Sequence, residues 1–192
     1  MKDSELAKLK ALEMFENDDW IRWIHEGTVP AHSNVEKLAN IALSISALGK
    51  HCSRCLNING CCFPRNNMPQ FPLHLHCHCR IESIYKITAK AECELDKFTN
   101  YIFIDKGKKT LFKSWGYDII DSEWLQAEFI RQAKEKYENG DFGLGKLDDF
   151  GQRINIVITL RRKDKIGMVK FTTGWMVYPD GVIKLTTPYG GK

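Results

Sequence analysis

Hydrophobic positions at the start of the chain follow a helical spacing. Leu6, Leu9, Leu12 and Phe15 recur every three residues, which predicts a helix, and the apolar residues 20–24 predict a second short one. The first part of the chain is therefore expected to be helical.

A third helix is indicated by a start signal and a stop signal. Ser33 followed by Glu36 forms a capping box, and apolar positions then mark one helix face as far as Leu48. Gly49 can close this helix, so residues 1–50 are predicted as a helical segment.

The second half of the chain shows a different pattern. A strand is predicted at residues 101–104, a short helix at 108–115, and a longer helix that Asp121 caps and that runs to residue 137. Apolar and polar residues then alternate, which is typical of strands, and the predicted strands are residues 154–160, 171–177 and 182–187.

Cysteine placement adds candidate chemistry to this outline. Six of the seven cysteines and three of the six histidines lie within residues 52–79, and only Cys93 stands apart. Disulfide frameworks spread cysteines along a fold, whereas metal sites concentrate them, so the cluster predicts a structural Zn²⁺ site. The candidate ligands are Cys52, Cys55, His74, Cys77 and Cys79.

Two alternatives remain open within this cluster. His74 can replace either Cys77 or Cys79 as a ligand, and Cys61 and Cys62 are either buried thiols or ligands in another arrangement. A catalytic zinc needs an open position and a nearby acid or base, and Glu82 is the only carboxylate close to the ligand segments. We therefore expect a structural zinc.

Composition and charge limit the class of protein. The chain has 192 residues, 43% hydrophobic and 27% charged, with a net charge of +4 that permits a polyanionic partner without requiring one. It contains no apolar run long enough to span a membrane and no secretory signal at its start, so we expect a cytoplasmic protein without a membrane partner.

These patterns together predict an α+β fold. A helical N-terminal part with a zinc knuckle precedes a small domain in which a three-stranded antiparallel meander packs with two helices. The predicted division is a helical segment at 1–50, a Cys/His module at 51–89 and an α+β domain at 90–192.

The cysteine-rich region carries, in order, Cys52, Cys55, Asn59, Gly60, Phe63, Pro72, His74, Cys77, Cys79 and Arg80. This order resembles the C-terminal metal motif of phage Mu protein F-like head morphogenesis proteins, although Leu75 stands where proline is usual and His78 where arginine is usual. The resemblance covers residues 35–87. It implies a phage-head or virion-associated module, often followed by a toxin domain.

The region that follows carries Tyr101, Gly107, Lys109, Phe112, Trp115, Gly116, Tyr117, Gly151, Thr173, Gly174, Trp175 and residues 185–189. Through this order, residues 95–189 resemble uncharacterised α+β domains at the C-terminal ends of bacterial polymorphic toxins and of Mu F-like proteins. By analogy with neighbouring families, the resemblance implies a metal-independent RNase of the barnase, colicin or RelE type, delivered to a target cell. RNA would then be the substrate, and a cognate immunity protein the partner.

RNA cleavage through the 2′-hydroxyl needs proton transfer and positive charge on the phosphate. No histidine follows His78, which excludes a barnase-like histidine and leaves a RelE-like arrangement of cations, hydroxyls and aromatic rings. The candidate residues are Lys109, Arg153, Arg161, Thr173, Trp175, Thr187 and Tyr189. Each has a structural alternative as a solvated charge, a strand former or a core aromatic residue.

Three functions therefore remain open at this stage. The chain is a zinc-containing RNase toxin, a non-enzymatic virion protein that binds a phage head component, or a zinc-dependent nucleic-acid binder without catalysis. Binding that weakens steeply with added salt would indicate the third function, because phosphate contacts release counterions.

Overall fold

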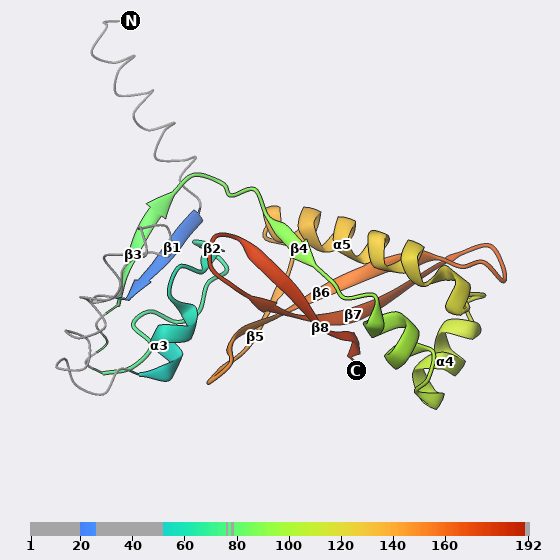
Figure 1. The fold of residues 1–192 in the computed structure, drawn as a ribbon. Helices are drawn as coiled ribbons and strands as arrows, with labels where there is room; N and C mark the ends of the chain where they lie inside the picture. Colours follow the sequence, from blue (N-terminus) through green and yellow to red (C-terminus); the bar gives the residue numbers. More distant parts are fainter. Residues whose placement is uncertain (1–19, 26–51, 76, 78, 191–192) are drawn as a thin grey trace, which may run out of the picture.

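A computed structural model describes residues 20–25, 52–75, 77 and 79–190. The helices predicted around residues 6–15 and 33–48 lie outside the described residues. Within these residues the chain contains both helices and sheets, as the α+β class requires (Figure 1).

The first sheet corrects the prediction of a helix at residues 20–24. These residues belong to the strand β1, Trp20–His25, which lies between β2, Cys62–Pro64, and β3, Cys79–Ile84. Both neighbours pair antiparallel with β1. Trp20 and Ile21 point to opposite faces of β1 and both are buried, so the apolar residues do not alternate, and a short run of this kind resembles a helix face.

The second sheet confirms the predicted meander and extends it. Strands β6, β7 and β8 are antiparallel neighbours, and the sheet order is β4-β8-β7-β6-β5. The strands are β4 (Lys90–Glu92), β5 (Gly143–Asp148), β6 (Gly151–Arg161), β7 (Met168–Val177) and β8 (Val182–Gly190). The edge strand β4, for which the sequence pattern predicted no element, pairs parallel to β8.

Helix α3 lies between β1 and β2 along the sequence, and the other helices lie between β4 and β5. They are α3 (Ser53–Ile58), η1 (Lys97–Ile102), α4 (Lys106–Lys113), η2 (Ile119–Asp121) and α5 (Ser122–Glu138). The short and long helices predicted after residue 107 are confirmed as α4 and α5. None of these described helices has the length and apolar character that a membrane crossing needs.

The strand predicted at residues 101–104 is wrong. Residues 97–102 form η1, in which Phe98 and Ile102 are both buried while Tyr101 is exposed. Buried residues four positions apart indicate a helical turn, because they lie on one helix face. The apolar run in the sequence was too short to distinguish the two periods.

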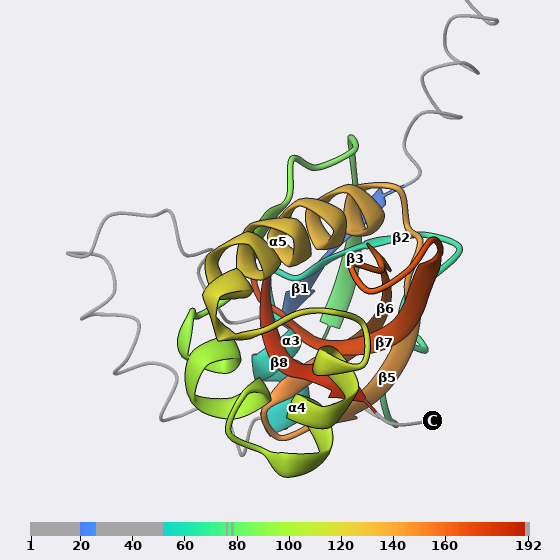
Figure 2. The same cartoon turned by 90° about the vertical axis from the view of Figure 1, so that its right-hand side faces the viewer.

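One buried hydrophobic cluster joins the Cys/His module to the second sheet. Helix α5 covers one face of that sheet, where the Phe129 and Phe171 rings lie 5.8 Å apart between centroids (Figures 1 and 2). The cluster continues to Trp23 of β1. The Tyr137 hydroxyl of α5 also donates a hydrogen bond to the Cys62 carbonyl oxygen. The domain boundary near residue 90 stays a prediction, but core packing crosses it.

Candidate metal centre

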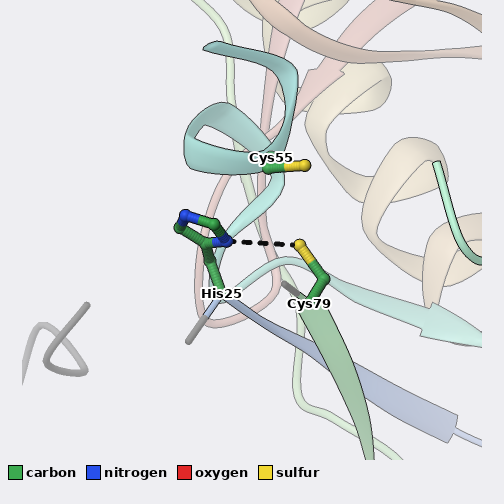
Figure 3. Close-up of side chains that lie close together, drawn as sticks. All are labelled: His25, Cys55 and Cys79. Carbon is green, nitrogen blue, oxygen red and sulfur yellow. Dashed lines mark hydrogen bonds between the residues drawn. The ribbon is translucent and has the colours of Figure 1, made fainter. Parts of the chain in front are cut away.

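Three elements bring His25, Cys55 and Cys79 together. His25 ends β1 and Cys79 begins β3, and strand pairing places these two residues directly opposite each other. The His25 Nδ1 atom lies 3.4 Å from the Cys79 Sγ atom, and Cys55 approaches them from α3 (Figure 3). The three possible ligand atoms all lie within 4.8 Å of one another.

A second group shares Cys55 with the first. Cys52, Cys55 and His74 also place their ligand atoms within 4.8 Å of one another. The Cys55 Sγ atom lies 3.1 Å from His74 Nε2 and 3.7 Å from the Cys77 Sγ atom. Cys55 therefore lies at the centre of the whole cluster.

The His74 ring is oriented as a metal ligand would be. Its Nδ1–H group donates a 2.8 Å hydrogen bond to the Leu75 carbonyl oxygen, which leaves the Nε2 lone pair directed at Cys55. Such a bond from the second ring nitrogen commonly fixes the tautomer and orientation of a metal-bound histidine.

Backbone contacts hold the end of β1 against the end of α3. The His25 N–H group donates to the Asn59 side-chain oxygen at 2.9 Å, and the Gly60 N–H group donates to the Trp23 carbonyl oxygen at 2.7 Å. Gly60 has a φ of +79°, which favours glycine at this turn. The turn after α3 thus fixes the position of His25.

The spacing of the donor atoms fits a tetrahedral ion. Zinc–sulfur bonds of about 2.3 Å place two sulfur ligands about 3.8 Å apart. The distance between the Cys55 and Cys77 sulfur atoms is 3.7 Å, and the distance between His25 nitrogen and Cys79 sulfur is 3.4 Å. Thiolates and imidazoles are soft or borderline ligands, so these groups could hold a transition metal.

The surroundings of the cluster disfavour the thiolate form of Cys55 when no cation is bound. Burial raises the pKa of the Cys55 thiol, and the neighbouring sulfurs of Cys79 and Cys77 raise it further. Burial also tends to raise the pKa of Cys77, but hydrogen bonds from the backbones of Cys79 and Leu73 and from the thiols of Cys79 and Cys55 together hold that pKa below its usual value. A divalent cation would favour the deprotonated forms.

The Trp23 indole lies beside the cluster. Burial raises the pKa of the Cys79 thiol, and the Trp23 N–H group opposes this effect by favouring the thiolate. The indole nitrogen is buried and has no other hydrogen-bond acceptor within the described part of the chain. Trp23 can therefore support a metal-bound Cys79 sulfur.

The five ligands predicted from sequence all lie in this cluster, and the structure adds His25. This histidine was missed because residues 20–24 were interpreted as a helix, which hid its pairing with Cys79. Cys61 and Cys62 are fully buried and donate weak hydrogen bonds to backbone carbonyl oxygens, and they belong to neither group of possible ligands among the described residues. Burial raises the pKa of the isolated Cys93 thiol to about 12.

Two of the proposed catalytic residues lie in the core. Thr173 and Trp175 are both 0% exposed. The Thr173 hydroxyl donates to the Ile156 carbonyl oxygen at 2.7 Å and accepts from the Trp175 indole N–H at 2.8 Å. Their polar groups are satisfied within the protein, so the expectation that they contact RNA is corrected.

The remaining candidates are divided between two places. Arg153 and Arg161 lie on the same face of β6 but roughly 27 Å apart along the strand, since they are eight residues apart. Thr187 lies two strands away from β6 at the level of Asn155, because it pairs with Gly174, which in turn is opposite Asn155. Lys109 lies on the exposed side of α4. Tyr189 packs against the core, where its ring lies 5.9 Å from the Phe171 ring. Among these described candidates, Arg153 and Thr187 lie towards the same end of the sheet, with β7 between them.

Known proteins give no guide to these two sites, so we infer the function from the residues of this chain. Comparison with protein-family models, curated proteins and solved structures finds no match.

Proposed function

We propose that the chain is a phage- or toxin-derived protein in which Zn²⁺ stabilises the Cys/His module and the C-terminal α+β part cleaves RNA without a metal. The zinc part rests on the cluster around Cys55. The RNA part rests on one observation: the sheet face opposite α5 carries a cation, an amide and two hydroxyls within neighbouring strands.

A structural role for zinc is supported by where its ligands originate. His25 and Cys79 come from β1 and β3, and Cys55 comes from α3. The ion would tie three short elements together, and such sites contribute directly to folding. Neither group of possible ligands contains a carboxylate among the described residues, so nothing there supports the activation of a bound water.

The sheet face opposite α5 is exposed along the middle of β6, although Met176 on this face is buried beside Arg153. Along β6 the apolar side chains of Ile154, Ile156 and Ile158 are buried, whereas Asn155 is exposed and Val157 is 41% exposed. Arg153 lies on the same side of the strand as Asn155, because side chains alternate between faces. This face is available to a long polyanion.

Gly174 creates a recess on this open face. A Cβ atom at Gly174 would lie 3.2 Å from the Thr186 hydroxyl and 3.6 Å from the Thr187 hydroxyl. The first distance is shorter than an ordinary contact, so the recess is too narrow even for a methyl group, and Asn155 borders it from β6. A sugar or phosphate group of RNA would contact the polar groups at the rim of this recess.

Arg153 supplies the charge next to the recess. Its guanidinium forms a 3.1 Å ion pair with Asp148, and 44% of its side chain remains exposed. The guanidinium can stabilise the phosphate in the transition state, while Thr187 and Asn155 orient the ribose. Arginine and threonine exchange protons poorly at neutral pH, so catalysis here would depend on positioning and charge stabilisation.

The alternative is a non-enzymatic virion protein that binds a phage head component. The burial of Thr173 and Trp175 favours it, because two residues of the family resemblance serve the core instead of a surface. Tight binding to a head protein without any RNA cleavage would support this alternative.

Incubation of the full chain with total cellular RNA tests the proposal. We expect defined fragments whose yield is unchanged by a chelator, and a roughly 100-fold slower cleavage for Arg153→Gln. Thr187→Val is expected to slow cleavage by about 10-fold. Intact RNA with the unaltered protein would overturn the nuclease proposal.

Lys170→Gln is the matched control for Arg153→Gln. Lys170 lies on the same sheet but pairs with Thr159, roughly 13 Å along β6 from Asn155. The substitution removes one positive charge in the same way, so it separates a specific role of Arg153 from general attraction of RNA. Equal losses of activity for both variants would contradict the proposed site.

A further inference from the structure

A pocket of about 610 Å³ lies at the end of the second sheet that is farther from Arg153, next to Arg161. It is formed by the loop after α4, the start of α5 and the turn that joins β6 to β7. Its lining residues are Tyr117, Asp121, Trp124, Arg161, Arg162 and Lys163. None of them belongs to the metal centre or to the recess at Gly174.

Two stacked aromatic rings form one wall of this pocket. The Tyr117 and Trp124 rings are nearly parallel, at 14°, and their centroids are 5.7 Å apart. Tyr117 is buried and its hydroxyl donates a 2.6 Å hydrogen bond to the Arg161 carbonyl oxygen, whereas Trp124 is 51% exposed. The inner ring is therefore fixed, and the outer indole presents a large apolar surface to solvent.

The cations of the pocket differ in how they are held. Arg162 forms a 2.7 Å ion pair with Asp164, and Lys163 forms a 2.8 Å ion pair with Asp121. Arg161 is exposed, and its guanidinium forms no hydrogen bond or ion pair with the described residues. Arg161 is thus the cation that can accept an external anion without losing an internal partner.

Backbone contacts hold the two sides of the pocket together. The Lys163 N–H group donates to the Trp115 carbonyl oxygen at 2.8 Å, and the Arg162 guanidinium donates to the Ser114 carbonyl oxygen at 2.7 Å. Gly116 has a φ of +85°, and a Cβ atom there would lie 2.6 Å from the Asp164 nitrogen. The loop and the turn therefore meet at close range, so the pocket is formed before a ligand arrives.

We propose that this pocket binds one nucleobase of single-stranded RNA, with the base stacked on Trp124 and an adjacent phosphate on Arg161. Aromatic side chains beside cations are the usual means of binding single strands without sequence preference. Three cations against one carboxylate give the lining a positive balance. An acidic peptide would satisfy the cations but has no need of a stacked indole.

The inference extends the RNA-directed part of the proposed function to a second contact. Arg161 is roughly 27 Å along β6 from Arg153, so a bound base here would anchor a strand that reaches the recess several nucleotides away. Anchoring raises the affinity for longer substrates without taking part in cleavage.

The test is equilibrium binding of the full chain to a labelled ten-nucleotide oligoadenylate, with an abasic ribose-phosphate strand of equal length as the comparison. Trp124→Ala is expected to weaken oligoadenylate binding roughly 10- to 100-fold and to remove the preference over the abasic strand. Trp124→Phe retains a ring and is expected to keep most of that preference. Arg161→Ala is expected to lower the slope of log affinity against log salt by about one.

Lys165→Ala removes a charge from the same turn but not from the pocket lining, and it should change binding less than about 3-fold. Any one of three results would overturn the inference. These are equal affinity of the protein for oligoadenylate and the abasic strand, unchanged oligoadenylate affinity of Trp124→Ala, and complete displacement of oligoadenylate by polyglutamate. If binding behaves as expected but RNA stays intact, the pocket stands and the nuclease proposal fails.

Discussion

Replacement of His25 by alanine tests the ligand that sequence patterns did not indicate. The change removes the imidazole 3.4 Å from the Cys79 sulfur, and it keeps the backbone N–H group that binds Asn59. Any loss of metal affinity therefore reports the side chain itself.

The expected magnitude follows from the number of ligands. A structural zinc site contributes roughly 10–16 kcal/mol, so each of four ligands accounts for roughly 3 kcal/mol. Cys52 and His74 also lie within reach of Cys55 and can take a vacated position, which reduces the expected loss to about 2 kcal/mol. This corresponds to about 30-fold weaker binding.

Competition against a colourimetric zinc chelator at pH 7 measures this difference. Cys93→Ser is the matched control, because it alters a buried cysteine outside the cluster and should leave zinc affinity unchanged. An unchanged affinity for His25→Ala would refute its role as a ligand. Absence of stoichiometric zinc from reduced, folded protein would refute the structural site as a whole.

Three further predictions concern the second sheet. Lys90 and Lys184 hold the pKa of Glu92 at about 2, below its ordinary value of 4.5. Ionised Glu92 therefore stabilises the fold above pH 4.5, and this contribution is lost as pH falls from 4.5 towards 2. Glu92→Gln should accordingly lower the melting temperature at pH 7 but not at pH 2, and an equal difference at both would contradict the ion pairs. Trp175→Ala should cost about 3–5 kcal/mol in denaturant unfolding, because the side chain is fully buried; a loss below 1 kcal/mol would mean that it is not in the core. Gly116→Ala should cost about 2 kcal/mol in the same assay, since it combines a positive φ with a Cβ clash against the β6–β7 turn; an unchanged midpoint would refute that close approach.

The meander was predictable because its burial follows a strict period. Ile154, Ile156 and Ile158 are buried while Asn155 and Val157 are exposed, and this alternation is visible in the sequence. The edge strand β4 was not predictable, because it has only three residues and gains its structure from pairing with β8. Short edge strands carry too little pattern of their own.

The metal cluster was predictable only where its ligands are close in sequence. The spacing between Cys52 and Cys55 is a local signal, and so is the crowding of donors near Cys77. His25 lies 54 residues from Cys79, and only the pairing of β1 with β3 brings them together. A ligand supplied by strand pairing becomes visible once the register is known.

The catalytic candidates show what a motif resemblance omits. Thr173 and Trp175 belong to a recognisable sequence pattern, but the pattern does not say which face of β7 they occupy. Because Gly174 lies between them on the opposite face, one residue of register decides which positions meet solvent. The threonine hydroxyls on β8, which are only partly buried, were the better candidates.

The parallel pairing of β4 with β8 has a consequence for how the protein forms. The segment that leads out of the cysteine-rich module acquires its strand only when residues 182–190 are present, although it is synthesised long before them. Nascent chains that have emerged as far as α5 therefore leave this edge unpaired. Pairing with β8, a contact between residues far apart in sequence, is therefore the step that completes this edge of the sheet.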